Sequence, residues 1–387
     1  MRYLLLSLLG LCFSLPLFAQ IHAAPVPPAT TYLITNDDLP PKTAATSGSV
    51  FTIASDGTPQ SPVKVTLGGS GSAGGYFSAA RVSVLQSSSC AYLTLSGAGE
   101  IGGVDLTTLQ DVGNFLASST DSGLANGIGL VNNGSHLYAS YSSSNTIATF
   151  AILPGCALSF LGDISPLGKQ GGNVKGMAVH GNILVLTYGD GSIESFNVSD
   201  GLPVSNGDLQ NATGYLTSRF PAAVDITQDG RYALFGDLST TSTVEVSDIS
   251  SGKLTKTALY DVGVAGNATG IYLSPDQSFL YIANTNAGRV TAAFFNATTG
   301  RLSRGCTSAT LRGFISGWTY LSSPVTKLNS GTGSVLYLAE FGPSAGIAVV
   351  NVFSSGGSCT LTESSSSPVT APTTTLLSIG VYPSRQF

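Results

Sequence analysis

The feature that most constrains the fold is a repeat of short, apolar β-type segments along the chain. These segments begin at positions 81, 127, 176, 222, 270, 321 and 375, so that successive starts lie 46 to 54 residues apart. Each is followed by a turn and, in the best-preserved repeats, by a second β-type segment such as Leu280–Ala283 or Val335–Ala339. The spacing is typical of a unit of four short strands and is too long for most solenoid repeats. One four-stranded sheet cannot bury both of its faces, so the units must stack, and radial stacking closes them into a ring.

The two ends of the repeat region complement each other. The N-terminal unit opens on a second strand, Thr31–Thr35, with no first strand before it, while Thr375–Val381 is a first strand with no second strand after it. Joining the two completes a blade and leaves no open sheet edge. The sequence therefore predicts an all-β fold, a single seven-bladed β-propeller over residues 24–387, whose last blade is closed by N- and C-terminal strands.

The first residues read as a secretory signal peptide. A positive charge at Arg2 precedes an apolar run, Leu4–Phe18, and small residues follow at Ala19, Ala23 and Ala24. The run is too short to span a bilayer, and no later segment offers 18 uninterrupted apolar residues, so we expect no membrane span. We predict a leader at 1–23, cleavage after Ala23, and a secreted protein in the extracellular space or the periplasm.

Composition excludes several classes of protein. Only 10% of the residues are charged and 47 of 387 are glycine, which suits short strands and tight turns and argues against a cytosolic α/β enzyme. The 42% of hydrophobic residues, arranged in regular short runs, argue against disorder. A net charge of −5 gives no electrostatic reason to bind nucleic acid or anionic lipid. We expect a monomer.

Five cysteines are present, and Cys12 belongs to the predicted leader. The remaining four can pair in three ways, and in an exported chain an even number suggests two disulfides. We favour Cys90–Cys156 and Cys306–Cys359, each of which would link neighbouring repeats. The alternative is four buried thiols.

Two stretches carry a family resemblance. Leu273–Asn284, which reads LSPDQSFLYIAN, is followed by Arg289–Arg301, and Asp225–Phe235 is a looser copy. Both resemble the repeat of seven-bladed lactonase-like propellers and of their relatives with a Tyr-Val-Thr-Asn repeat. The resemblance implies a propeller fold, cleavage or formation of a sugar or related lactone, and basic and acidic residues near the central funnel. A Pro-His motif is common before a blade in that family, but here Ser218–Val224 contains proline without histidine.

Candidate site residues gather where the loops of a propeller converge over its channel. Carboxylates following or flanking second strands are Asp37, Asp38, Glu100, Asp190, Asp237 and Glu340. Loops between blades add Tyr76, Lys175, Arg219, Trp318 and Tyr320. Six carboxylates at a channel mouth could hold a divalent cation through oxygen ligands, and no other cofactor is indicated. Each acidic residue alone is equally well explained by a turn. The two remaining histidines, His136 and His180, fit structural positions better than that of a general base.

Two functions follow from these residues. The first is a non-catalytic binding or scaffold protein that holds a small polar ligand, a glycan or a protein on the channel face. In it the ligand contacts would come from Tyr76, Trp318, Tyr320, Asp190 and Glu100. The alternative is a divergent lactonase that hydrolyses a sugar or related lactone. In it Arg219 and Lys175 would polarise the carbonyl, with Asp237 or Glu340 as base.

The chain also contains five N-x-S/T sequons, which suggest surface loops. They begin at Asn133, Asn197, Asn211, Asn267 and Asn296. A eukaryotic host would glycosylate some of them, although a chain so rich in serine and threonine supplies several by chance.

Overall fold

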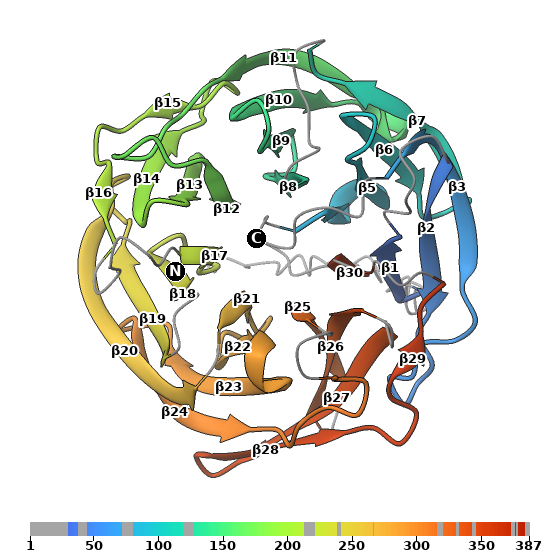
Figure 1. Ribbon diagram of the computed structural model, residues 1–387, viewed down its shortest axis with the longest axis vertical. Helices are drawn as coiled ribbons and strands as arrows, with labels where there is room; N and C mark the ends of the chain where they lie inside the picture. The colour runs from blue at the N-terminus through green and yellow to red at the C-terminus, as the bar shows by residue number, and fades with distance from the viewer. Residues whose placement is uncertain are drawn as a thin grey trace, which may run out of the picture. The chain divides into compact units, whose positions relative to one another are not determined.

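The computed structural model describes residues 30–37, 45–71, 80–118, 127–212, 221–237, 241–265, 267–315, 320–329, 333–342, 346–372, 376 and 378–383. The predicted leader lies outside these residues. Within them the strands form seven antiparallel sheets, and there is no α-helix. Figure 1 shows the sheets arranged radially around a centre, which confirms the predicted seven-bladed β-propeller.

Blades 1 to 3 are formed by strands between Tyr32 and Ile164 and by the last strand of the chain. Blade 1 contains β30 (Ser378–Tyr382), β1 (Tyr32–Asn36), β2 (Ala45–Thr52) and β3 (Val63–Ser70), from the inside outwards. Blade 2 contains β4 (Val82–Leu85), β5 (Cys90–Leu95), β6 (Glu100–Asp105) and β7 (Gln110–Leu116). Blade 3 contains β8 (Ile128–Asn132), β9 (His136–Tyr141), β10 (Thr146–Ile152) and β11 (Leu158–Ile164).

Blades 4 to 7 follow in chain order. Blade 4 contains β12 (Val174–His180), β13 (Ile183–Tyr188) and β14 (Ser192–Asn197), with two short outer strands, β15 (Val204–Ser205) and β16 (Gln210–Asn211). Blade 5 contains β17 (Pro221–Ile226), β18 (Tyr232–Asp237), β19 (Thr241–Asp248) and β20 (Thr255–Ala265). Blade 6 contains β21 (Ala268–Leu273), β22 (Phe279–Asn284), β23 (Arg289–Asn296) and β24 (Arg301–Thr307). Blade 7 contains β25 (Tyr320–Asn329), β26 (Gly333–Phe341), β27 (Gly346–Ser355), β28 (Ser358–Glu363) and the short β29 (Val369–Thr370). Single 3-10 turns are η1 (Gln86–Ser88), η2 (Pro154–Cys156) and η3 (Thr285–Ala287).

The ring is closed by its two termini. The innermost strands contact one another in the circular order β30, β4, β8, β12, β17, β21, β25 and back to β30. In blade 1, β30 pairs antiparallel with β1, in a register that runs from Tyr32 opposite Tyr382 to Asn36 opposite Ser378. The predicted closure is therefore confirmed. The C-terminal strand begins at Ser378, three residues later than the sequence pattern suggested.

The hydrophobic core lies between the blades. The described residues form seven buried apolar clusters, one at each interface between neighbouring blades. β22 shows why its sequence is apolar on both faces: Leu280 and Ile282 pack toward blade 5, whereas Tyr281 and Ala283 pack toward blade 7. A second strand placed between two blades is buried on both sides, so it reads as a continuous apolar run rather than as an alternating one.

Two disulfides join neighbouring blades. Cys90 of β5 pairs with Cys156 of η2, which links blades 2 and 3, and Cys306 of β24 pairs with Cys359 of β28, which links blades 6 and 7. The favoured connectivity is confirmed. None of the residues described here belongs to a helix that is long and apolar enough to cross a bilayer.

Candidate functional site at one end of the channel

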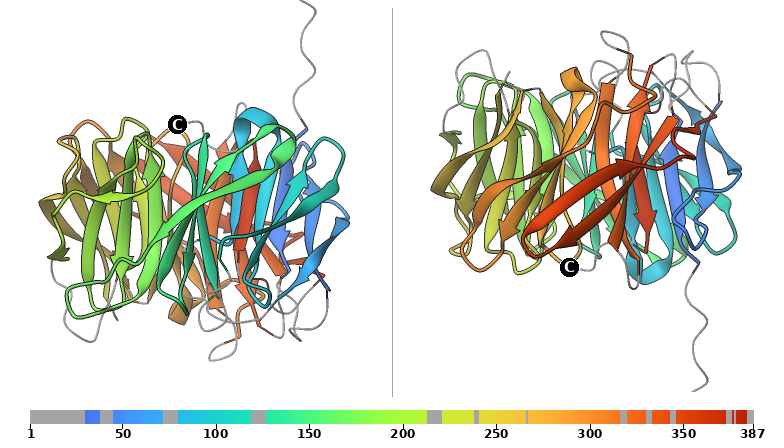
Figure 2. Two further views of the ribbon diagram at one scale, coloured as in Figure 1. Left: turned by 90° about the horizontal axis from the view of Figure 1, so that it is seen from above. Right: turned by 90° about the horizontal axis from the view of Figure 1, so that it is seen from below.

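Strand direction decides which residues meet at each end of the propeller. In blades 2 to 7 the innermost strand begins, and the second strand ends, at the same end, because consecutive strands in each blade are antiparallel. β30 and β1 of blade 1 have the same directions. The loops between second and third strands also lie there. We call this end the channel end; Figure 2 shows the blades from the side, with the strands running between the two ends.

Four consecutive blades carry an irregularity at the channel end of their innermost strands. The register between first and second strands shifts at Val174/Gly176 in blade 4, Pro221/Ala223 in blade 5, Ala268/Gly270 in blade 6 and Ser322/Val325 in blade 7. The described pairs between the first and second strands of blades 1, 2 and 3 show no shift; those of blade 2 begin at Val82 opposite Leu93. Bulges of this kind re-aim side chains and are frequent at rims and beside active sites. We call the channel ends of blades 4 to 7 the bulged arc.

Lys175 is the extra residue of the first bulge. Val174 and Gly176 pair with Tyr188 and Thr187, so Lys175 is skipped in the ladder. Its aliphatic chain lies against Gly189, where an added Cβ would come within 3.0 Å of Lys175 Cε. Burial lowers the pKa of the Lys175 ammonium from its ordinary value. The bulge therefore places a partly desolvated cation at the channel end of blade 4.

Asp237 ends the second strand of blade 5 and is buried. It lies on the same face of β18 as Ala233 and Phe235, which belong to the cluster between blades 4 and 5. Thr243 Oγ1 donates a hydrogen bond of 3.1 Å to its Oδ2. Asp237 is thus directed toward the blade that carries Lys175.

Asp37 follows the second strand of blade 1 and accepts hydrogen bonds from the hydroxyl groups of Thr35, Ser47 and Ser49. Burial raises the pKa of the Asp37 carboxyl, and these hydrogen bonds offset part of that effect. The hydroxyl groups are all from blade 1, which makes Asp37 a well-satisfied internal acid of that blade.

Glu340 is the most unusual acid of the site. It is 0% exposed, and within the described part of the chain neither carboxylate oxygen has a hydrogen-bond partner. Leu336 and Leu338 lie on the same face of β26 and pack in the cluster between blades 6 and 7. Burial, with a smaller contribution from the charge of Glu363, raises the pKa of Glu340 to about 7. A carboxylate in this condition is close to half-protonated at neutral pH.

Glu340 is covered by the segment that connects blades 6 and 7, residues 308–315, which we call the cap segment. An added Cβ on Gly313 would come within 2.1 Å of Glu340 Oε2, so the cap backbone lies directly against the carboxylate. Leu311 is buried in the interface cluster between these blades, and the ring of Phe314 lies on Gly288. The cap segment therefore closes Glu340 off from solvent.

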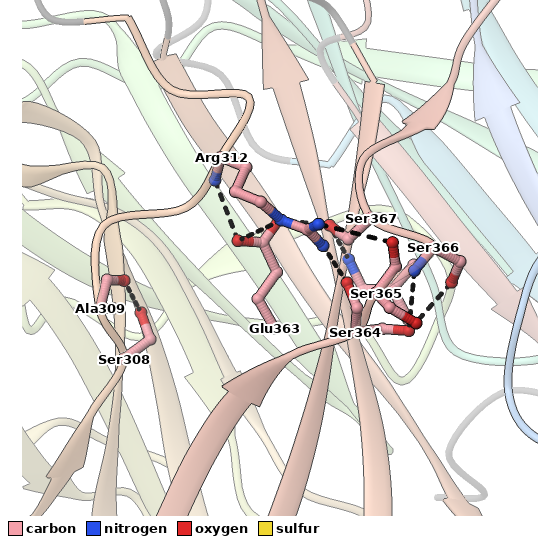
Figure 3. Close-up of polar contacts among 9 residues, drawn as sticks. Ser308, Ala309, Arg312, Glu363, Ser364, Ser365, Ser366 and Ser367 are labelled. Carbon is pink, nitrogen blue, oxygen red and sulfur yellow. Dashed lines mark hydrogen bonds and ion pairs between the residues drawn. The ribbon is translucent and has the colours of Figure 1, made fainter.

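A polar cluster ties the cap segment to the outer part of blade 7 (Figure 3). The Arg312 backbone N–H donates to Glu363 Oε2 at 2.9 Å, and its Nε lies 3.4 Å from the same oxygen. The guanidinium also donates to the carbonyl oxygens of Ser364 and Ser365. Ser367 Oγ donates to Glu363 Oε1 at 2.6 Å. Glu363 thereby anchors the cover of Glu340.

Asp190 organises a loop. Its carboxylate accepts hydrogen bonds from the backbone N–H groups of Gln170, Gly172 and Ser192 and from the Ser192 hydroxyl. Burial acts to raise the pKa of Asp190, but these hydrogen bonds outweigh it and hold the pKa below the usual value. The carboxylate is occupied by donors from the loop between blades 3 and 4 and from the start of β14.

Glu100 begins the third strand of blade 2, outside the bulged arc. It accepts a hydrogen bond of 3.2 Å from Asn114 Nδ2. An added Cβ on Gly69 would lie 2.9 Å from its Oε2, which places this side chain against blade 1.

Five further candidate residues were predicted from the sequence. Asp38, Tyr76, Arg219 and Trp318 lie outside the described residues. Tyr320 begins β25, opposite Phe341. Among the residues that are described, no group of three or more His, Cys, Asp or Glu side chains could hold a metal ion. Asp237 and Glu340 are directed into different interfaces between blades.

The sequence analysis did not select Arg81, a residue with a marked position at the channel end. It is 1% exposed and precedes β4; its backbone N–H donates to Ser378 Oγ at 3.0 Å and its Nη1 to Ser96 Oγ at 3.4 Å. The guanidinium lies against Gly127, where an added Cβ would come within 2.2 Å of Nη2. Arg81 therefore connects blades 1, 2 and 3. Its signal in the sequence is that the other six repeat segments open on an uncharged residue.

Fold and site together define the class: a disulfide-linked seven-bladed β-propeller with a polar, asymmetric channel end. No protein-family model and no curated protein matches the sequence. Solved structures do. A candidate 6-phosphogluconolactonase from Bacteroides fragilis superposes with a TM-score of 0.66 at 16% identity, over 92% of this chain and 99% of the other. A candidate 6-phosphogluconolactonase from Bacteroides uniformis has a TM-score of 0.66 at 13% identity, over 91% and 99%. A protein of unknown function from Desulfotomaculum acetoxidans has a TM-score of 0.58 at 14% identity, over 86% and 98%. At these identities the likeness establishes the lactonase-like propeller fold alone.

Proposed function

We propose that this protein is an exported binding propeller that holds a small polar ligand at the bulged arc of its channel end. The observation that carries the proposal is the run of four bulges in the neighbouring blades 4 to 7. The described ladders of the other three blades show no such shift. Bulges at a rim are a usual way to direct side chains toward a ligand.

The chemistry of the arc favours a ligand with hydroxyl or carboxylate groups. Lys175 supplies a cation whose pKa is lowered by burial, and Asp237 supplies a buried negative charge in the adjacent blade. The hydroxyl oxygens of a sugar can accept hydrogen bonds from the ammonium, and the carboxylate of an aldonic acid can pair with its charge. Binding is placed before catalysis because Glu340, the candidate base with a pKa near 7, is closed off beneath the cap segment.

Export is part of the proposal. It is supported by the apolar N-terminal run and by the two disulfides, which persist in oxidising compartments. The partner class remains a small polar ligand, a glycan or a protein segment that presents the same groups.

A divergent lactonase is the second candidate, and one observation favours it. A carboxyl group with a pKa of about 7 is suited to general acid–base chemistry at neutral pH. In this candidate Glu340 accepts a proton from the attacking water after the cap segment moves, and Lys175 stabilises the developing oxyanion. The fold likeness to the two Bacteroides proteins is consistent with this reading.

The test is a ligand panel of monosaccharides, aldonic acids and sugar lactones, read by thermal shift and by acid release at constant pH. We expect at least one compound to raise the melting temperature without turnover, and we expect Lys175→Met to abolish that shift. Lys253→Met is the control, because Lys253 is an exposed lysine between β19 and β20, at the opposite end of blade 5.

The outcomes separate the two candidates. Acid release that disappears in Glu340→Gln would replace the binding proposal with the lactonase. A folded protein that neither binds nor hydrolyses any compound would contradict both. A shift that survives Lys175→Met but is lost in Lys253→Met would move the site away from the bulged arc.

A further inference from the structure

One type of turn recurs in several blades, at the end of the propeller opposite the channel end. The turns that join third and fourth strands in blades 2, 4, 5 and 6 begin with Asp or Asn and have Ser or Thr two residues later. They are Asp105–Leu109, Asn197–Gly201, Asp248–Gly252 and Asn296–Gly300. In two of them the first residue is asparagine, and those two turns are N-x-S/T sequons.

The turn uses only one atom of the first side chain. Asn197 Oδ1 accepts the Ser199 N–H at 2.9 Å, and Asn296 Oδ1 accepts the Thr299 N–H at 3.1 Å. In the equivalent turns Asp105 Oδ1 accepts from Thr107 at 2.7 Å and Asp248 Oδ1 accepts from Ser250 at 2.8 Å. Aspartate therefore fulfils this role as well as asparagine does. Among the described residues, the Nδ2 group of neither asparagine makes a hydrogen bond within the turn.

The far side of each turn is fixed on the preceding blade. An added Cβ on Gly201 would meet His136, and Tyr138 OH donates to the Gly201 carbonyl at 3.1 Å. Gly300 lies equally close to Tyr232. Both asparagines are themselves exposed. The turn is thus packed at its glycine end and open at its asparagine end, where a bulky group on Nδ2 meets solvent.

We propose that Asn197 and Asn296 are N-glycosylation sites when this chain passes through a eukaryotic secretory pathway. The donor is a lipid-diphosphate-linked oligosaccharide. A bond forms between Nδ2 and C1 of the reducing-end sugar, the bond from C1 to the diphosphate oxygen breaks, the amide loses one proton and the lipid diphosphate leaves. Both glycans then extend from the end opposite the bulged arc, so that the arc stays open to its ligand.

The structure distinguishes these two sequons from two of the others. Asn133 is partly buried, and its Nδ2 donates to the Gly181 carbonyl of blade 4 at 3.2 Å, so a glycan there would disturb a contact between blades. Asn267 is half-buried at the channel end, beside the bulge of blade 6. We expect low occupancy at both. The sequon of Asn211 ends at Thr213, outside the described residues, and does not belong to the proposal.

The experiment is secretion of the chain from yeast, followed by intact mass before and after peptide-N-glycosidase treatment in ¹⁸O water. Peptide mapping should then locate labelled aspartate at positions 197 and 296. Asn197→Asp and Asn296→Asp should each remove one glycan and leave the melting temperature unchanged, because aspartate already occupies this position in blades 2 and 5. Ser199→Ala and Thr298→Ala should remove the same glycans while keeping the asparagines.

A gain of site provides the matched control. Asp105→Asn creates the sequon Asn-Leu-Thr in the equivalent turn of blade 2, and we expect one added glycan on the secreted, folded protein. A secreted wild-type protein without glycans at 197 and 296, or with glycans confined to the other three sequons, would overturn the proposal. So would failure of both Asp105→Asn and Asp248→Asn to gain a glycan.

Discussion

Glu340 is the residue at which burial and charge conflict most directly. Its carboxylate is removed from water, and none of the described residues donates a hydrogen bond to it. The ordinary pKa of 4.5 is raised to about 7 in the folded protein. Between these two values the unfolded chain carries the charge while the folded chain keeps the proton. The contribution of Glu340 to stability is therefore most favourable below pH 4.5, falls as the pH rises toward 7, and stays at its lower value above pH 7.

Glu340→Gln should remove this dependence. The shift corresponds to roughly 3 kcal/mol, so we expect the variant to match the wild type near pH 4.5 and to exceed its unfolding free energy by up to about that amount at pH 8. Chemical denaturation at pH 4.5, 6 and 8 measures it. Glu194→Gln is the control, because Tyr188 OH and Ser205 Oγ already donate to Glu194 and the change should lower stability at pH 8. An equal response of both variants would contradict the account.

Strand order alone fixes which ends of the strands coincide, and in the structure Lys175, Asp237 and Glu340 lie at the channel end; that they form a site stays a prediction. Strand order could not give their directions. Successive side chains of a strand point to opposite faces, and one bulge shifts that alternation. The direction of the Lys175 side chain depends on such a bulge, and no residue type in the sequence predicts it. Arg81 escaped notice for a related reason: its environment is assembled from three blades.

At the scale of elements, covalent and packing contacts join neighbouring blades. The pair Cys306–Cys359 joins the outer strands of blades 6 and 7 and closes a loop of 53 residues. It lies in the same interface that contains the cap segment and Glu340. Its position therefore predicts that it stabilises the cover of the candidate site as well as the ring.

Replacing both cysteines of this bridge with serine should cost up to about 4 kcal/mol, because the unfolded chain regains the entropy that the loop had removed. The urea midpoint under non-reducing conditions measures the loss. Reduction of the wild-type protein should lower the midpoint further, since Cys90–Cys156 is then lost as well. A midpoint that stays unchanged in the double variant would show that the native interface holds without the bridge.

How well a strand could be predicted from the sequence depends on how much of it is buried. The second strands were the clearest segments of the sequence because they are apolar on both faces, as in Phe279–Asn284. The outer strands were not, because they face solvent: in blade 4 the outer position is divided between β15 and β16, of two residues each. Exposed strands are specified by pairing with their neighbours rather than by their own pattern.

At the scale of the whole molecule, the closing blade holds the two ends of the chain together. Its inner strand β30 supplies Ile379 and Val381 to the interface with blade 7. Gly380 faces blade 2, where an added Cβ would lie 2.9 Å from Val82 Cγ1 and from Val84 Cγ2. The ring therefore depends on one short strand that contacts both neighbouring blades and pairs with β1.

Deletion of residues 376–387 should open the ring. The edge of β1 and the apolar faces of blades 7 and 2 would then be exposed together, and an unpaired edge beside apolar surface promotes association between chains. We expect a lower melting temperature and self-association by light scattering coupled to size exclusion. Deletion of residues 384–387 is the control, because it leaves every pair between β1 and β30 intact.

Gly380→Val tests the same contact without removing the strand. The ladder between β1 and β30 can form, but the added side chain collides with blade 2. We therefore expect a lower melting temperature and a smaller tendency to associate than in the deletion. If the longer deletion kept the melting temperature and the size of the full chain, closure by the two termini would not be what stabilises this propeller.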